Sequence, residues 1–101
     1  MSQMLSIANR SRTFFYVYVL KNSHRLHRLY IGFTNDLDRR LAEHKEGKVF
    51  STKNLKDFCL IYYEAYICEN DARIREKRLK YFGKAYQELK KRINGGLEGA
   101  G

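Results

Sequence analysis

Four side chains along this sequence have the types and spacing that chemistry on a phosphodiester bond requires. Tyr18 and Tyr30 lie in two short segments rich in aromatic and β-branched residues, which predict strands. Arg40 and His44 follow in a segment with helical periodicity, one turn apart, so they can act together. Hydroxyl, guanidinium and imidazole groups converging on one surface of a basic protein favour phosphate chemistry over packing alone.

The phase of the predicted helix decides which of two adjacent arginines belongs to this group. At about 100° per residue, Arg40 and His44 lie in one sector, beside the apolar stripe that the helix should bury. Arg39 points the other way. The alternative interpretation is structural: Arg40 is an edge residue whose charged end reaches water, and His44 is a partly buried histidine with a satisfied hydrogen bond.

A second helical segment contributes one carboxylate. Glu76 shares a sector with Ala72 and Leu79, so it should point toward the core side of a helix rich in Lys and Arg. A carboxylate in that position needs a partner. The partner is either Arg40 or Arg75, which would make a structural ion pair, or a divalent cation, which prefers oxygen ligands. The sequence leaves both alternatives open.

Further cationic and hydroxyl side chains are candidates for contacts with a nucleic-acid backbone. Residues 48–53 form a polar loop whose ammonium groups, hydroxyls and aromatic ring suit phosphate binding and stacking. A solvated surface loop is the alternative interpretation. Together with two cations of the second helical segment, the candidate contacts are Lys48, Ser51, Thr52, Lys53, Arg75 and Lys80.

The charge balance of the whole chain favours an anionic partner. Its 101 residues carry 20 Lys and Arg against 11 Asp and Glu, a formal net charge of +9. Nucleic acid is the expected partner, ahead of an anionic membrane surface. Cys59 and Cys68 show neither metal spacing nor a disulfide framework, and no apolar run reaches the roughly 20 residues of a membrane span. We expect a cytoplasmic protein without a membrane partner or a small-molecule cofactor.

The order of the predicted elements defines an α+β domain, or α/β in the broad sense. Strands are expected at residues 14–20, 29–33 and 58–66, with a long hairpin loop over residues 21–28. Helices are expected at about residues 37–46, 71–82 and 84–93, with Gly47 ending the first and Asn70 capping the second. The result is a small three-stranded antiparallel sheet flanked by helices, in the order β-β-α-β-α-α.

Glycines mark two places where the chain should depart from regular structure. Gly32 lies within a predicted strand, which indicates close approach of a backbone or a ligand, or else a bulge. The glycine-rich residues 95–101 predict a flexible tail. Residues 1–13 are expected to form a disordered N-terminal extension, which leaves residues 14–94 as the folded domain.

These residues resemble the GIY-YIG nuclease superfamily over about residues 14–93. Tyr16-Val17-Tyr18 stands at the first family motif, with tyrosine in place of its first glycine, and Tyr30-Ile31-Gly32 is the second motif. The pattern Leu37-x-x-Arg40-Leu41-x-x-His44 is similar to the helix that follows in the family. Ala72-x-x-x-Glu76 is similar to the distal helix that carries the acidic residue. The chain looks most like small stand-alone bacterial members.

The resemblance implies a metal-dependent endonuclease that hydrolyses DNA with one divalent cation, Mg²⁺ or Mn²⁺, on structured or damaged DNA of the kind met in DNA repair. By position, Glu76 would be the metal ligand and Arg40 would stabilise charge developing on the phosphate. Tyr18 would be the general base or orient the attacking water, with a nearby cation lowering its pKa from about 10. Tyr30 and His44 would complete the hydrogen-bonded site, and His44 is a second candidate base.

A nucleic-acid-binding module with this fold but little or no catalysis is the alternative. Many active members have a further asparagine after the acidic helix, and Asn94 is the one late asparagine in this chain. Many members also join the nuclease module to a separate DNA-binding domain, which the sequence does not show. A protein-binding adaptor that uses the sheet surface is a third hypothesis.

Overall fold

The sheet has three strands with the first strand at its centre. The computed structural model describes residues 13–22, 25–49 and 58–99. All neighbouring strands are antiparallel, and their order is β2-β1-β3. The strands are β1 (Phe15–Asn22), β2 (Arg25–Thr34) and β3 (Phe58–Tyr66). This confirms the predicted antiparallel sheet and, with the helices described next, the α+β fold class.

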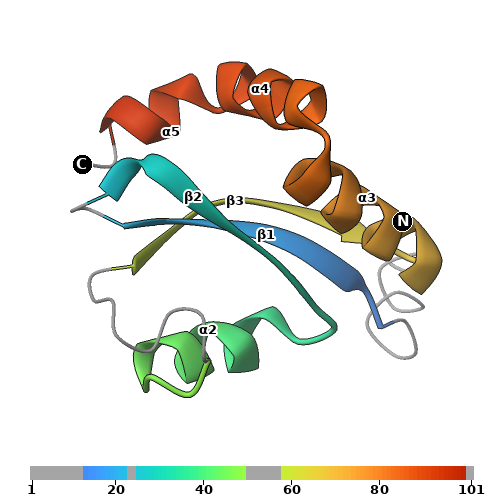
Figure 1. Ribbon diagram of the computed structural model, residues 1–101. Coiled ribbons are helices and arrows are strands. Elements are labelled where there is room, and N and C mark those ends of the chain that lie inside the picture. Colours follow the sequence, from blue (N-terminus) through green and yellow to red (C-terminus); the bar gives the residue numbers. More distant parts are fainter. Residues whose placement is uncertain (1–12, 23–24, 50–57, 100–101) are drawn as a thin grey trace, which may run out of the picture.

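Helices cover both faces of the sheet. Helix α2 (Leu37–Lys45) lies on one face, and three helices follow each other along the opposite face (Figure 1). These three are α3 (Glu69–Tyr81), α4 (Gly83–Arg92) and α5 (Asn94–Gly99). The predicted order β-β-α-β-α-α is therefore confirmed, with one further short helix at its end.

The apolar core lies between the sheet and the helices α3 to α5. Successive side chains of a strand point to opposite faces. Val17 and Val19 of β1 therefore share a face with their neighbour Ile31 of β2, and all three are buried. They pack against Ala72 and Leu79 of α3, Leu89 of α4 and Ile93, the residue that joins α4 to α5. Tyr18 and Tyr30 alternate with these core residues and point toward α2.

Helix α2 has a defined cap at each end. Asp36 is its N-cap, and its side chain accepts a hydrogen bond from the backbone N–H of Arg39 at 3.1 Å. Gly47 has a φ of 76°, the left-handed conformation that glycine adopts without steric cost. The amides of Gly47 and Lys48 donate back to carbonyls of the last turn, as in a Schellman motif. These caps fix the turn that carries His44.

The hairpin between β1 and β2 is tighter than the sequence predicts. β1 extends to Asn22 and β2 begins at Arg25, so most of the predicted loop over residues 21–28 is strand. Asn22 pairs with Arg25 after a shift in register next to Lys21. Polar side chains do not prevent backbone pairing, because the ladder uses only main-chain groups.

Helices α3 and α4 begin differently from the prediction. Cys68, rather than Asn70, is the N-cap of α3, and its side chain makes no capping hydrogen bond. Acidic residues in the first turn, Glu69 and Asp71, favour the N-terminus instead through the helix dipole. The break before α4 comes at Phe82, whose φ of −117° and ψ of 102° are extended, one residue before Gly83.

The predicted flexible tail at residues 95–101 is wrong for residues 95–99, which belong to α5. Glycine has a low helix propensity, so local sequence disfavours this helix. Tertiary contacts hold it: Lys21 Nζ donates to the carbonyl of Leu97 at 2.9 Å, and Leu97 packs against the core. Residues 1–12 and 100–101 lie outside the described residues, so the predicted N-terminal extension stays a prediction.

Candidate active site

A buried hydrogen bond joins the central strand to α2. The hydroxyl of Tyr18 lies 2.7 Å from Nε2 of His44. Tyr18 is 0% exposed and His44 is 3% exposed. The ring of Tyr30 lies edge-on to His44 at a centroid distance of 5.0 Å, and 6.1 Å from the ring of Tyr18. The structure thus brings these three sequence-predicted site residues into one aromatic cluster.

Gly32 makes room for the Tyr18 ring. The two residues are cross-strand partners in β2 and β1, without a shift in register at that point. A Cβ atom at Gly32 would lie 2.3 Å from Cζ of Tyr18, much closer than atoms can approach. The glycine within the strand therefore reflects close approach, as one predicted alternative has it, and the approaching group is a side chain of the same chain.

Arg40 lies between the cluster and the solvent. Its Nη1 is 2.9 Å from Oε1 of Glu43, and its side chain is 34% exposed. Its Nε is buried and has no hydrogen-bond partner in the described part of the chain. Such a donor is costly unless a ligand or water satisfies it. Arg40 also lies close enough to Tyr18 to affect the pKa of that phenol.

The pKa of Tyr18 is raised above its ordinary value of 10.0. Burial is the largest cause and Tyr30 adds to it, whereas Arg40 acts in the opposite direction. The cation that the sequence predicts beside Tyr18 is therefore present, but burial outweighs it. Tyr18 is a neutral phenol at physiological pH and is not an anionic base in this conformation.

The pKa of His44 is lowered, first by burial and then by the nearby Arg40. Its imidazole is therefore neutral at pH 7 and has one donor and one acceptor nitrogen. The cationic Arg40 beside the Tyr18 oxygen favours the arrangement in which Tyr18 donates to Nε2 of His44. With that tautomer, His44 is positioned to take a proton from Tyr18.

Glu76 lies on α3, on the side of the sheet opposite α2 (Figure 1). Its Oε2 is 2.9 Å from Nζ of Lys80, and its side chain is 18% exposed. The predicted structural partners are wrong, because Arg40 pairs with Glu43 and Arg75 pairs with Glu64. Among the described residues, no cluster of three His, Cys, Asp or Glu side chains forms a metal site.

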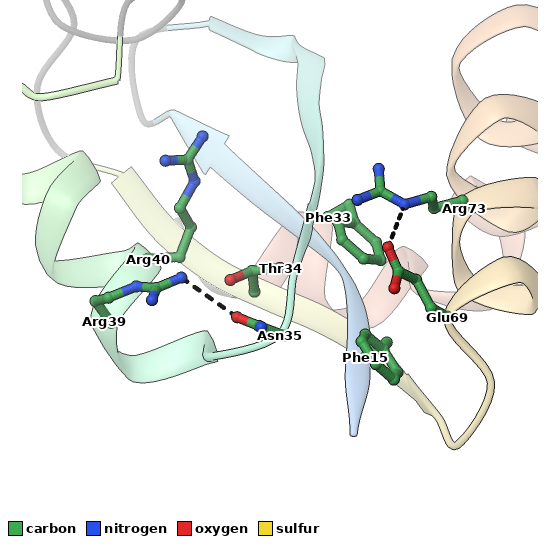
Figure 2. Close-up of a pocket in the computed structure, with 8 residues that line it drawn as sticks. All are labelled: Phe15, Phe33, Thr34, Asn35, Arg39, Arg40, Glu69 and Arg73. Carbon is green, nitrogen blue, oxygen red and sulfur yellow. Dashed lines mark hydrogen bonds and ion pairs between the residues drawn. The ribbon is translucent and has the colours of Figure 1, made fainter. Parts of the chain in front are cut away.

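An open cavity of about 330 Å³ lies where the N-terminal turns of α2 and α3 meet the end of the sheet (Figure 2). It is lined by Phe15, Phe33, Thr34, Asn35, Arg39, Arg40, Glu69 and Arg73. Helical phase directs Arg39 away from Arg40, yet both line this cavity, because it extends around the first turn of α2. The acidic residue that shares the cavity with Arg40 is Glu69.

A family model described as the GIY-YIG catalytic domain matches residues 14–81 of the chain. The chain belongs to the GIY-YIG family. A UPF0213 protein of Staphylococcus haemolyticus is 34% identical over 76 residues, which cover 74% of this chain and 89% of the relative. A UPF0213 protein of Bacillus pumilus is 35% identical over 75 residues, covering 73% and 74%. No solved structure matches.

Membership of the GIY-YIG family places the chain among nucleases. Of the residues at its motifs, the structure gathers Tyr30 and His44 around Tyr18. Of the helices in the described ranges, none is long and apolar enough to cross a bilayer. The names of the relatives assign no substrate, and no cation is defined by the structure. The substrate and the metal are therefore matters for proposal.

Arg75, a predicted nucleic-acid contact, is instead part of a structural ion pair in this GIY-YIG domain. Its Nε and Nη2 donate to the Glu64 carboxylate of β3 at 3.0 Å each. The hydroxyls of Tyr62 and Tyr66 donate to the same carboxylate. Burial would raise the pKa of Glu64, but these donors together lower it. The donors of Arg75 are thus directed at Glu64, and α3 is fixed to the edge strand.

The other predicted nucleic-acid contacts stay predictions. Lys48 is exposed and pairs with Glu46 at 2.9 Å, and Lys80 pairs with Glu76. Ser51, Thr52 and Lys53 lie outside the described residues. Sequence reasoning assigned no role to Glu69 and Arg73, which line the cavity beside Arg40. Their i, i+4 spacing at the start of a helix was the available signal.

Proposed function

We propose that this chain is a cytoplasmic, metal-dependent endonuclease that hydrolyses phosphodiester bonds of DNA, with structured or damaged DNA as its substrate. Its membership of the GIY-YIG family supports the nuclease class. The observation that carries the proposal is the buried Tyr18–His44 hydrogen bond beside Arg40. The net charge of +9 supports a polyanionic substrate.

Arg40 is the group that we propose to bind the scissile phosphate. Its guanidinium keeps its charge at every physiological pH and has a planar set of donors that matches phosphate oxygens. The unpaired Nε supports this role, since a phosphate oxygen would satisfy it. Bound there, Arg40 would stabilise the negative charge that grows on the phosphate in the transition state.

Proton transfer in this proposal runs inward from Tyr30. Tyr30 is half-buried and can meet a water molecule, whereas Tyr18 is fully buried and His44 is almost fully buried. As the water attacks phosphorus, the bond from phosphorus to the leaving oxygen breaks, and that oxygen takes a proton from solvent. The proton of the attacking water passes to Tyr30, Tyr30 gives its own proton to Tyr18, and Tyr18 gives its own to Nε2 of His44. His44 is the final acceptor because burial and Arg40 lower its pKa, so its imidazole is neutral at pH 7 and can accept a proton.

Glu76 is the residue that we propose to hold one divalent cation, Mg²⁺ or Mn²⁺. Mg²⁺ is commonly bound by one or two carboxylates, with waters and substrate phosphate oxygens completing its shell. A single partly exposed carboxylate therefore fits, provided that Lys80 gives up Oε2. The cation would supply charge stabilisation at the phosphate and the leaving oxygen.

Nicking of plasmid and structured DNA with Mg²⁺ or Mn²⁺ tests this function. We expect Arg40→Ala and Glu76→Ala to lower the rate by on the order of a hundredfold or more. Arg78→Ala and Glu88→Ala make the same charge changes at exposed helical positions and should retain most activity. Equal rates in all five proteins would show that the cleavage is not due to this site.

A nucleic-acid-binding module without catalysis is the second candidate, and one observation favours it. Tyr18 and His44 are almost fully buried, and Glu76 already has a cationic partner. This function predicts binding whose logarithm falls linearly with the logarithm of salt concentration, without cleavage at any metal concentration. Metal-dependent cleavage that is lost in Glu76→Ala would exclude it.

A further inference from the structure

The cavity between α2 and α3 differs in composition from the Tyr18 cluster. Three of its lining side chains are arginines and one is a carboxylate, so its wall carries an excess of positive charge. The arginines come from two helices on opposite faces of the sheet, Arg39 and Arg40 from α2 and Arg73 from α3 (Figure 2). An anion that enters the cavity can therefore be contacted from two sides.

Arg73 is held in a fixed orientation at this wall. Its guanidinium carbon lies 4.1 Å from the centroid of the Phe33 ring, which is itself stacked on Phe15 at 6.3 Å. Stacking on an aromatic face leaves the in-plane N–H groups of an arginine available as donors. One of them, Nε, lies 2.7 Å from Oε2 of Glu69. Glu69 thus aligns Arg73 and neutralises part of its charge.

Arg39 is more loosely held on the facing wall. Its Nη2 donates to Oδ1 of Asn35 at 3.3 Å, and its Nε is 3.8 Å from Glu43. The side chain is more than half exposed, so it can reorient toward an anion at small cost. Figure 2 shows Arg39 directed toward Asn35 and Arg40 extending in a different direction. The guanidinium groups of the two adjacent arginines can therefore contact different parts of a bound ligand.

We infer that this cavity binds the phosphate adjacent to the scissile one on the same nucleic-acid strand, with Arg39 and Arg73 as its ligands. The inference rests on the proposed function, because Arg40 defines the scissile position. A strand whose scissile phosphate lies at Arg40 has its neighbouring phosphate one nucleotide away, and the cavity that Arg40 lines also carries Arg39 and Arg73. Glu69 limits the affinity of the cavity, since it competes with phosphate for Arg73.

Salt-dependent binding tests the inference without any cleavage. The probe is a short fluorescein-labelled single-stranded oligonucleotide, titrated in the presence of a chelator at several salt concentrations. We expect Arg39→Ala and Arg73→Ala each to weaken binding on the order of tenfold. The double variant should also reduce the slope of log affinity against log salt by about 0.7, the value for one lost phosphate contact with a single strand, and each single variant should reduce it by part of that amount. Glu69→Gln should tighten binding.

The control is Arg78→Ala, which removes an exposed arginine of α3 that does not line the cavity. Slopes unchanged by Arg39→Ala and Arg73→Ala, or changed equally by Arg78→Ala, would overturn the inference. If Arg73→Ala unfolds because it loses its Phe33 contact, Glu69→Gln carries the test, and weaker binding by that variant would overturn the inference.

Cleavage kinetics then separate the two proposals. In an active enzyme, Arg39→Ala should raise KM more than it lowers kcat, as expected for a binding contact outside the reacting centre. If the protein cleaves DNA but neither Arg39→Ala nor Arg73→Ala changes the slope of log affinity against log salt, only the cavity assignment is overturned. If the arginine variants show the expected salt slopes but the protein shows no metal-dependent cleavage, the nuclease function is overturned. The cavity then remains a phosphate-binding site.

Discussion

The ring of Tyr18 occupies the space that a side chain at position 32 would fill, so two motifs of the family form one packing unit. The first motif supplies the aromatic ring and the second supplies the glycine opposite it. This arrangement brings the Tyr18 hydroxyl to His44. Glycine is therefore needed at position 32 to leave space for the Tyr18 ring, and not for the formation of the strand.

Gly32→Ala should consequently disrupt the site as well as the fold. The new methyl group would overlap the Tyr18 ring, and overpacking of this kind costs about 1–3 kcal/mol. Thermal unfolding measures the loss of stability, and the cleavage assay measures the displacement of Tyr18. Gly83→Ala is the matched control, because a Cβ atom there meets nothing within 4 Å. Equal stability of the two variants would contradict the packing argument.

His44 should make stability depend on pH below neutrality. Its folded-state pKa is lowered, by burial and then Arg40, with Glu43 acting in the opposite direction. Its stabilisation is therefore complete above the unfolded pKa of about 6.5 and is lost as the pH falls toward the folded value. The free energy of unfolding should fall by up to about 1.4 kcal/mol per pH unit in this range.

The comparison with His44→Asn isolates that contribution, since the other two histidines of the chain are unchanged. Denaturant unfolding at several values between pH 7 and pH 5 gives the two slopes. The variant should be less stable at pH 7 and should show a flatter dependence. Parallel curves would mean that His44 does not titrate differently in the folded and unfolded states.

The Glu64–Arg75 pair, which joins β3 to α3, should contribute more to stability than the exposed pairs within single helices. Glu64→Gln leaves Arg75 and two tyrosine hydroxyls with a weaker acceptor, at a cost of about 2 kcal/mol. Chemical denaturation measures this change, and a double-mutant cycle with Arg75→Met measures the coupling. Glu88→Gln, which disrupts an exposed pair with Lys91, is the control and should have little effect.

Lys21 should determine whether α5 stays folded. Lys21→Met removes the hydrogen bond to the Leu97 carbonyl but keeps a long side chain in the buried position. Hydrogen exchange of the amides in residues 94–99 should accelerate on the order of tenfold, which corresponds to one lost hydrogen bond. Amides of β1 and β3 should keep their protection. Unchanged exchange in α5 would show that Leu97 packing alone holds the helix.

Local sequence pattern predicts most elements of this fold because those elements have a local cause. The third strand occupies the predicted residues 58–66, where aromatic and β-branched side chains dominate. Helix α2 ends beside Gly47 because that position needs a left-handed backbone. Helix α5 lacks such a local cause, and the Lys21 contact that holds it comes from a strand more than seventy residues earlier.

When a charged residue pairs with a residue of another element, the choice of partner depends on how the two elements pack. The local sequence pattern does not contain that information. Helical phase correctly gave Glu76 a partner requirement, but several cations lie within reach of that helix. The choice of Glu64 for Arg75 follows from how α3 rests on β3. Lys80, in contrast, lies one turn after Glu76 on the same helix, at a spacing that the local pattern does contain. The raised pKa of Tyr18 is likewise a result of how completely α2 closes over the sheet.

Alternate residues of the central strand β1 have different roles. Val17 and Val19 point to the hydrophobic core, while the intervening Tyr18 points to the candidate active site. Because the two sets of side chains lie on opposite faces, a lineage can alter one set while the other is conserved. Substrate preference in such a domain can diverge in evolution at little cost in foldability, and the α2 face is where that divergence should be sought.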